Sequence, residues 1–210
     1  MIRRPPRSTL SSSSAASDVY KRQGPMMVWG ESKAFLGSSD LYAIVPENEW
    51  HPIFQNFQDT VLIVDKGQKK VSSTLGHGIM NGHPFAAQRF EQANRNIAAL
   101  KNALNTGDLH QFIDITESEA MSLHALMMTS QPRFMLMQPQ TLAIIQKIWD
   151  FRAESQLPLC FTLDAGANVH LLYPKKDCIS VMDFIKNELC GFCQNGEYIE
   201  DQVGNGPRKI

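Results

Sequence analysis

The stretch FTLDAGANVHLLYP, residues 161–174, contains two short apolar runs joined by a turn of small residues. Two such runs around a small-residue turn predict a β-hairpin. Asp164 stands where the first run ends, although aspartate forms strands poorly and is costly to bury unpaired. Two interpretations therefore stand open: Asp164 bonds its own turn amides, or it accepts a hydrogen bond from a substrate hydroxyl. The small residues Ala165, Gly166 and Ala167 would let a ligand approach the backbone closely.

The segments around this hairpin predict a fold that mixes helices and strands. A continuous apolar run over 59–65 predicts a buried strand. Helical spacing of apolar residues predicts four helices, with Gly107 ending the first and Asp108 capping the second: they cover 85–106, about 109–126, 140–155 and 176–189. Because strands and helices do not alternate regularly, the expected class is α+β.

Three further segments are expected to contribute little regular structure. Residues 24–32 have the pattern of the end of an apolar helix, and 38–54 are polar and proline-punctuated, which is typical of a connector. The tail, GEYIEDQVGNGPRKI over 196–210, is expected to be irregular. Glu117 and Glu119 are expected on a solvated helix face, and His124, within an apolar stretch, is expected to be an interior histidine.

Composition excludes several classes of protein. The apolar fraction of 43% is ordinary for a globular chain, and no apolar run approaches the roughly 20 residues that span a bilayer. The net charge is −1, but residues 1–23 contain five basic residues and only one acidic residue, so the rest is mildly acidic and does not suggest a nucleic-acid surface. Four cysteines are too sparse for a disulfide scaffold and fit a reducing cytosol.

Two motifs that resemble redox or metal sites are better explained without them. Cys190 and Cys193 have C-x-x-C spacing but follow a helical pattern, whereas a thioredoxin-like site opens a helix after a strand. Two ordinary cysteines are the favoured interpretation. His77 and His83 flank a short segment with no third ligand at a suitable spacing, so no metal site is expected.

Three hydroxyl side chains follow the strand predicted over 59–65, at Ser72, Ser73 and Thr74. Hydroxyls at the start of a helix cap its free amides, and the same geometry binds phosphate. Capping is the commoner explanation when the pattern stands alone.

The first 23 residues differ in character from the rest. They are rich in Arg and Ser and contain one acidic residue, a composition that fits a transit peptide or a basic disordered tail. The string also resembles translated read-through of a sequencing adapter, which is the interpretation we favour. In that case residues 1–23 are a non-native segment without function, and the gene is cut off on its 5′ side near residue 24.

Several segments together resemble one known family. SSDLYAI, GHPFAAQRF, SEAMSLHALMMTSQPRFMLMQPQT and FTLDAGANVHLLYP, together with the stretch that ends in VSST, occur in the order found in diphosphomevalonate decarboxylases of the GHMP kinase superfamily, and most resemble Bacteroidetes-type members. The resemblance implies a two-lobe fold of which 57–210 form the C-terminal domain, an antiparallel sheet packed with helices. Residues 24–56 would then be a remnant of the N-terminal lobe, which is otherwise missing.

The resemblance also implies an activity. These enzymes use ATP with Mg²⁺ to phosphorylate the 3-hydroxyl of (R)-5-diphosphomevalonate, and the product loses phosphate and carbon dioxide to give isopentenyl diphosphate. Asp164 would contact that hydroxyl as a base or an orienting group, Ser72, Ser73 and Thr74 would lie beside the diphosphate, and Ala165 and Gly166 would line the substrate. A cytoplasmic homodimer without resident metal, and without nucleic-acid or membrane partners, is implied.

The same resemblance sets limits and leaves alternatives. The family's phosphate loop is absent, so the chain alone is expected to be inactive. Many relatives carry methionine where His77 follows SSTLG, so the substrate contact there can differ. Another GHMP small-molecule kinase is one alternative, although FTLDAGANVH speaks against it. A non-catalytic α+β binding module that uses Ser72–Thr74 as a cap is the other.

Overall fold

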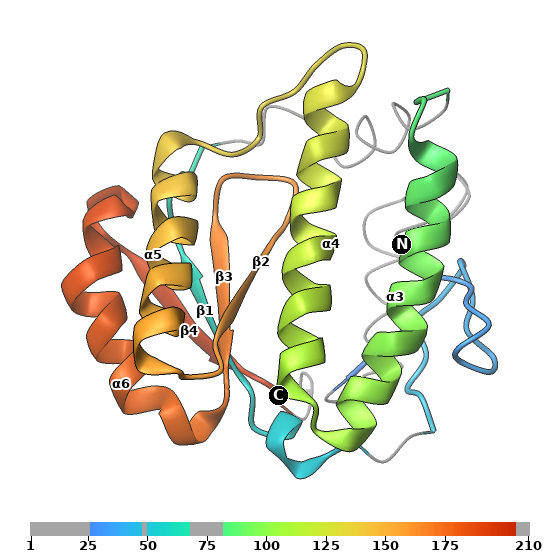
Figure 1. The fold of residues 1–210 in the computed structure, drawn as a ribbon, viewed down its shortest axis with the longest axis horizontal. Helices are drawn as coiled ribbons and strands as arrows, with labels where there is room; N and C mark the ends of the chain where they lie inside the picture. Colours follow the sequence, from blue (N-terminus) through green and yellow to red (C-terminus); the bar gives the residue numbers. More distant parts are fainter. Residues whose placement is uncertain (1–25, 48–49, 68–81, 205–210) are drawn as a thin grey trace, which may run out of the picture.

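The computed structural model describes residues 26–47, 50–67 and 82–204, and these form helices packed on an antiparallel sheet (Figure 1). The sheet has the strand order β2-β3-β1-β4, with every neighbouring pair antiparallel. The strands are β1 (Gln58–Leu62), β2 (Cys160–Leu163), β3 (Val169–Tyr173) and β4 (Tyr198–Gln202). The α+β class, the strand near 59–65 and the hairpin at 161–174 are thereby confirmed.

Strand β4 corrects one expectation, because the tail after residue 196 was predicted to be irregular. Its sequence YIEDQ has no alternation of apolar and polar residues, and four of its five side chains are exposed. The strand forms because β1 offers it a hydrogen-bonding edge, with Thr60 opposite Glu200. Pairing with a distant segment therefore decided a structure that local pattern could not signal.

Four helices were expected, and the structure has α3 (Ala86–Thr106), α4 (Leu109–Thr129), α5 (Pro139–Ser155) and α6 (Cys178–Phe184). A π-helical turn over Ile185–Leu189 continues α6. Gly107 ends α3 with φ of 78°, a conformation that favours glycine, and Asp108 caps α4 by accepting a hydrogen bond from the Gln111 amide. The resulting sharp turn lays α3 and α4 side by side (Figure 1).

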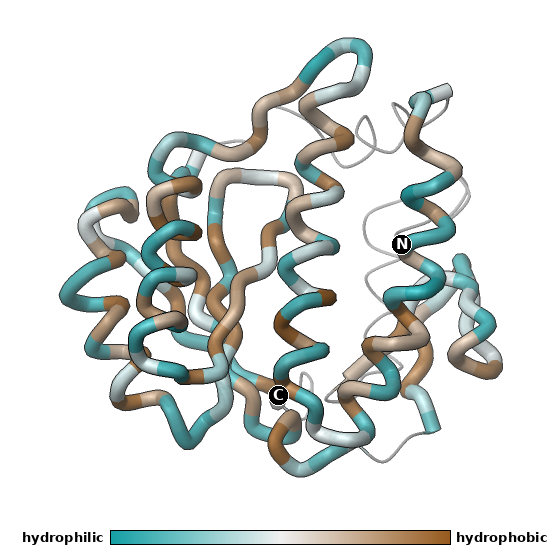
Figure 2. The backbone as a smooth tube through the Cα atoms, viewed as in Figure 1, coloured by the Kyte–Doolittle hydropathy of each residue, from teal (hydrophilic) through white to brown (hydrophobic). Residues whose placement is uncertain are grey.

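Both faces of the sheet carry apolar side chains that the helices cover. On one face, Leu62, Phe161 and Leu171 are fully buried with residues of α5 and α6. On the other face, Cys160 joins a cluster built around Phe54, Phe57 and Phe112. Figure 2 shows hydrophobic residues recurring along the strands and, alternating with hydrophilic ones, along the helices. The hairpin that carries Asp164 is therefore anchored in the core through both strands.

Glu117 is not on a solvated face, contrary to expectation. Its carboxylate is buried, accepts hydrogen bonds from Trp149 Nε1 at 2.8 Å and Arg152 at 3.0 Å, and lies on the side of α4 that packs on β2. Glu119 is also engaged, since it accepts from Arg89 and from Asn96 Nδ2 at 2.7 Å. The negative charge of these side chains suggested exposed positions. Buried carboxylates are nevertheless tolerated when a cation and further hydrogen-bond donors contact them.

The first described segment, 26–47, is not the end of a helix. Val28 and Ile44 pair in an isolated antiparallel bridge, with N···O distances of 2.9 and 2.8 Å. Lys101 on α3 donates a hydrogen bond to the Ala34 carbonyl at 2.7 Å, which attaches the segment to that helix. In the part of the chain that the structure describes, no helix is both long and apolar enough to cross a membrane.

Candidate active site

Asp164 lies immediately after β2, in the turn that leads to β3, and its side chain is exposed. The Asp164 carbonyl oxygen accepts a hydrogen bond from the Gly166 amide at 2.8 Å and lies 3.0 Å from Nε2 of His124. A carbonyl only accepts, so His124 Nε2 carries the proton of this bond. The backbone of Asp164 is thus held from α4 while its side chain remains exposed.

The other end of the turn is held by a second helix. The hydroxyl of Thr141, in the first turn of α5, donates to the Ala167 carbonyl at 2.6 Å, and Thr141 is fully buried. The same hydroxyl accepts from the Gln138 amide at 3.1 Å, which helps to begin α5. One side chain therefore fixes both the helix start and the turn.

A third contact joins the turn to the residues that follow β1. Asn168 Oδ1 accepts from the Asp65 amide at 2.9 Å. The Asp65 carboxylate in turn accepts from the Gly67 amide and from Gln138 Nε2, each at 2.7 Å. The residues that follow β1 are therefore attached both to the turn of Asp164 and to the start of α5.

The sequence-predicted site residues are only partly placed. Asp164, Ala165 and Gly166 are consecutive in the turn, and Ala165 and Gly166 are half-buried. Ser72, Ser73, Thr74 and His77 lie outside the described residues. A Cβ added at Gly166 would lie 2.9 Å from Asp164 Oδ1, so glycine leaves the space that the carboxylate occupies.

His124 is an interior histidine, as expected, with 1% of its surface exposed. Burial lowers the pKa of its imidazole, while the bond to the Asp164 carbonyl and the nearby Asp164 charge oppose that shift. A neutral ring protonated at Nε2 fits both the burial and the bond. Its partner, the backbone of Asp164, was not predicted, since nothing in the sequence brings α4 to the hairpin.

The remaining titratable candidates are accounted for by structural roles. All four cysteines are free, and burial raises the pKa of Cys193 to about 11 and also raises that of Cys190, so neither is an activated thiol. His83 Nε2 lies 3.1 Å from the Thr129 hydroxyl. Among the described residues, no group of three or more His, Cys, Asp or Glu side chains could hold a metal ion.

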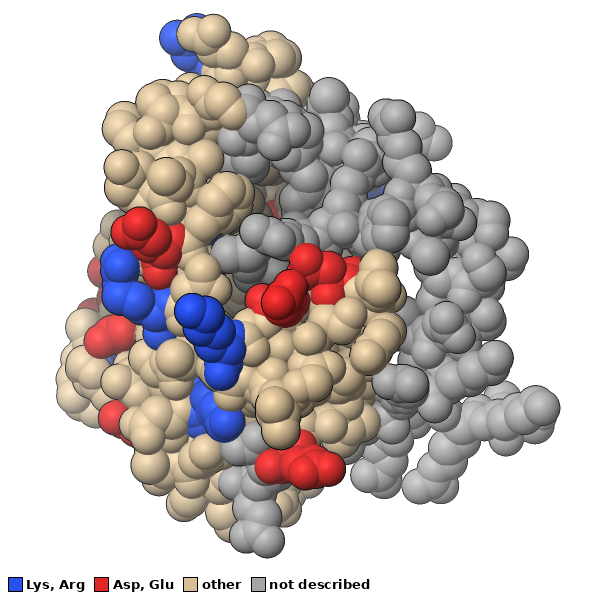
Figure 3. Space-filling model, turned by 90° about the vertical axis from the view of Figure 1, so that its right-hand side faces the viewer, with Lys and Arg blue, Asp and Glu red and all other residues tan. Residues whose placement is uncertain are grey.

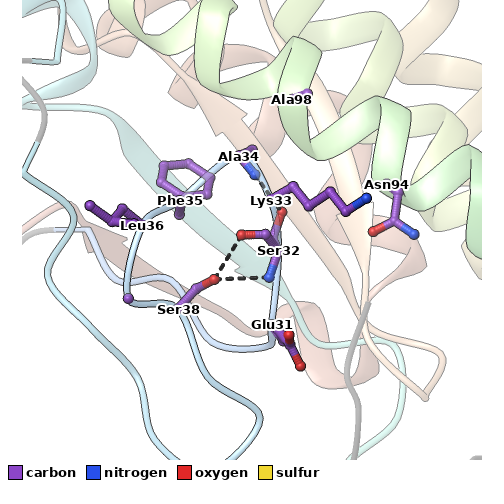
Figure 4. A pocket seen from close by; sticks show the side chains of 10 residues that line it. Glu31, Ser32, Lys33, Ala34, Phe35, Leu36, Ser38, Asn94 and Ala98 are labelled. Atoms are coloured by element: carbon purple, nitrogen blue, oxygen red, sulfur yellow. Dashed lines mark hydrogen bonds between the residues drawn. The ribbon is translucent and has the colours of Figure 1, made fainter.

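A cavity of about 820 Å³ lies elsewhere, between residues 31–38 and α3 (Figure 4). Ser38 Oγ closes the loop around it by bonding the Ser32 amide at 2.8 Å, and Lys33 extends toward Asn94. None of its lining residues belongs to the Asp164 turn. Figure 3 views the side of the molecule that lies on the right in Figure 1. On the described part of this side, basic and acidic side chains lie close to one another.

The described residues form an α+β lobe with an exposed aspartate in the β2–β3 turn. The family model of the mevalonate 5-diphosphate decarboxylase C-terminal domain matches residues 60–208. The chain belongs to this family.

Curated relatives and solved structures agree with that assignment. The diphosphomevalonate decarboxylase of Aspergillus fumigatus is 25% identical over 85% of this chain and 44% of its own length. The phosphomevalonate decarboxylase of Haloferax volcanii is 30% identical over 43% of this chain and 28% of its own.

Among solved structures, mevalonate diphosphate decarboxylase from Staphylococcus aureus superposes with a TM-score of 0.73 at 23% identity, covering 93% of this chain and 56% of that one. The enzyme from Legionella pneumophila gives 0.66 at 25% identity, over 77% and 49%. The chain thus spans about half of these structures and less than half of the curated relatives it matches.

Proposed function

We propose that this chain forms the hydroxyl-binding side of an enzyme that decarboxylates (R)-5-diphosphomevalonate to isopentenyl diphosphate with consumption of ATP. The observation that carries the proposal is the Asp164 turn: an exposed carboxylate whose backbone is bonded to a buried side chain of α4. A base or orienting group needs both access to substrate and a fixed direction. Family membership supplies the substrate class.

Asp164 accepts the hydrogen bond of the substrate 3-hydroxyl and orients or deprotonates it while that oxygen takes the phosphoryl group of ATP. The C3–O bond then breaks and phosphate leaves. The C1–C2 bond breaks, C1 leaves as carbon dioxide, and the electron pair of that bond forms the C2–C3 double bond. We assign Ala165 and Gly166 to the wall beside the hydroxyl, and Ser72, Ser73 and Thr74 to the diphosphate. A general base contributes about 10²–10⁴-fold, so the rest must come from positioning and charge stabilisation.

ATP with Mg²⁺ is the expected phosphoryl donor. A solved relative with a TM-score of 0.70 is a complex with MVAPP, AMPPCP and magnesium. The described residues of this chain offer no metal-binding cluster, so Mg²⁺ is assigned to the nucleotide and no step is assigned to it here. Turnover is therefore proposed for the lobe of this chain combined with a lobe that binds ATP, and the 210-residue chain alone is expected to be inactive.

A second candidate substrate is (R)-5-phosphomevalonate, because one relative is named a phosphomevalonate decarboxylase. Both substrates carry the same 3-hydroxyl, so Asp164 would act alike on either. The two differ by one phosphate, and the residues proposed to meet it, Ser72–Thr74, would decide between them.

The test measures ADP and carbon dioxide released by the protein translated from the complete gene, with each substrate. Equal release of both products from diphosphomevalonate, lost in Asp164→Asn by about 10²-fold or more, is expected. ADP without carbon dioxide would indicate a GHMP kinase. Absence of binding of either substrate, in calorimetric titration, would favour a non-catalytic module and overturn the proposal.

We also propose that the protein acts as a cytoplasmic homodimer, without nucleic-acid or membrane partners. Four free cysteines support a reducing compartment. Light scattering on the purified protein tests the oligomeric state, and a monomer at micromolar concentration would contradict it.

A further inference from the structure

We propose that His124 and Thr141 are positioning residues for the reaction: together they fix the two ends of the Asp164 turn and so set the direction of the Asp164 carboxylate. The catalytic part of this inference rests on the proposed function. The geometric part, that these two side chains determine the conformation of the turn, does not.

The two contacts come from different helices and reach different ends of the turn. His124 Nε2, on α4, bonds the Asp164 carbonyl at 3.0 Å, and the Thr141 hydroxyl, on α5, bonds the Ala167 carbonyl at 2.6 Å. Only 1% of His124 and 0% of Thr141 is exposed. Water therefore has little access to either donor, and the protein itself must supply any replacement partner.

The Asp164 carbonyl accepts two hydrogen bonds, from His124 Nε2 and the Gly166 amide. Two donors on one carbonyl fix the plane of the peptide that follows Asp164. The carboxylate of the same residue lies close over Gly166, where an added Cβ would be 2.9 Å from Oδ1. Rotation of this peptide would therefore move Gly166 and the carboxylate relative to each other, so the buried bond and the exposed acid are mechanically linked.

An ångström of misplacement at a reacting group can cost about 10²-fold in rate. The substrate diphosphate is assigned to Ser72–Thr74, which are not part of the turn. Loss of the His124 or Thr141 bond should therefore lower kcat and leave KM nearly unchanged. A residue that only stabilises the fold would not lower kcat once kcat is expressed per folded molecule, because the folded fraction would keep its normal rate.

The test compares donor-removing and donor-retaining variants. His124→Leu and Thr141→Val remove the hydrogen-bond donor, whereas His124→Gln and Thr141→Ser keep one. Leu126→Ala is the matched control, since Leu126 is buried on α4 and shares no hydrogen bond with the turn. In the protein from the complete gene, we expect kcat for diphosphomevalonate to fall about 10–100-fold in the donor-removing variants, with KM within about 3-fold. The donor-retaining variants should recover most of kcat, and the control should match the unchanged enzyme.

Nuclear magnetic resonance on the 210-residue chain gives a readout that needs no activity. The nitrogen shifts of His124 should show a neutral ring protonated at Nε2, and the Gly166 amide should shift in His124→Leu and Thr141→Val but not in Leu126→Ala. A Gly166 amide unchanged in both donor-removing variants, or a normal kcat in both, overturns the inference. If the unchanged enzyme does not decarboxylate while the Gly166 amide responds, the proposed function fails and the positioning geometry stands. If a donor-removing variant does not fold, the donor-retaining variant at the same position decides. Loss of both the normal kcat and the normal Gly166 amide chemical shift in that variant also overturns the inference.

Discussion

Asn168 Oδ1 accepts a hydrogen bond from the Asp65 amide across 2.9 Å, and this bond joins the end of the Asp164 turn to the residues that follow β1. The two segments are 103 positions apart in sequence. In the proposed function, one carries the acid that meets the 3-hydroxyl and the other leads to the hydroxyls that meet the diphosphate. The bond therefore connects the Asp164 turn to the segment that precedes the proposed diphosphate-binding residues in sequence.

Asn168→Ala should loosen that connection. It leaves the half-buried Asp65 amide without its partner, which costs about 1–3 kcal/mol of unfolding free energy. It should also weaken diphosphomevalonate binding, because Asp65 loses its contact with the turn to which the substrate hydroxyl is assigned. Urea unfolding and calorimetric titration measure the two effects. Asn94→Ala is the control, since Asn94 is exposed and its side-chain amide donates to the Phe90 carbonyl of its own helix. Equal stability and affinity in both variants would remove the proposed connection.

Gly166→Ala should displace the Asp164 carboxylate without unfolding the lobe. The added methyl would lie 2.9 Å from Asp164 Oδ1, closer than a Cβ tolerates, and the carboxylate is a side-chain end that can rotate away. We expect about 10²-fold lower turnover with a change of less than about 1 kcal/mol in unfolding free energy. Gly191→Ala is the control, because a Cβ there meets nothing within 4 Å. Normal turnover by Gly166→Ala would show that the carboxylate position is not critical.

Glu117→Ala should be among the most destabilising single changes in this lobe. It removes the partner of Arg152 and the acceptor of Trp149 Nε1, which leaves a partly buried cation uncompensated. Breaking such a pair from one side costs about 3–5 kcal/mol. Glu188→Ala removes an exposed pair with Lys147 and should cost less than about 1 kcal/mol. Urea unfolding of the two variants checks the ranking, and similar losses would mean that burial of Glu117 has no energetic consequence.

Cys193 should react slowly with iodoacetamide at neutral pH. Burial raises the pKa of its thiol to about 11, so very little thiolate is present near pH 7. Between about pH 9 and about pH 11 the unfolded state loses the Cys193 thiol proton while the folded state keeps it. The free energy of unfolding therefore falls as pH rises through this range. Mass spectrometry of the alkylated chain, with and without urea, gives the comparison. Rapid modification of Cys193 in the folded chain would be inconsistent with its burial.

Local pattern predicted what depends on neighbours in sequence. The hairpin around Asp164, the glycine stop at 107 and the cap at Asp108 each follow from residues within a few positions. The misses all depend on distant partners: β4 forms on the edge of β1, and Glu117 is buried because Arg152 reaches it. The same holds at the site. Asp164 stood out as a candidate from its own turn, and only the family resemblance favoured a role in catalysis, whereas His124 and Thr141 contact the turn from helices whose placement only the fold reveals.

His124 should make the lobe less stable in mild acid. Burial lowers the pKa of its imidazole from the ordinary value of 6.5, so the unfolded chain binds a proton more readily than the folded one. The stability that neutral His124 contributes to the folded state is fully present above about pH 6.5, and it is lost as pH falls toward the lowered pKa of the folded state. His124→Gln keeps a donor but does not titrate. The unfolding free energy of the unchanged chain should therefore fall relative to that of this variant as pH decreases from about 7 to about 5. Urea unfolding at both pH values measures that difference, and His110→Gln serves as the control because His110 is exposed. A difference that does not change with pH would mean that the folded state accommodates a charged His124, contrary to its burial beneath the turn.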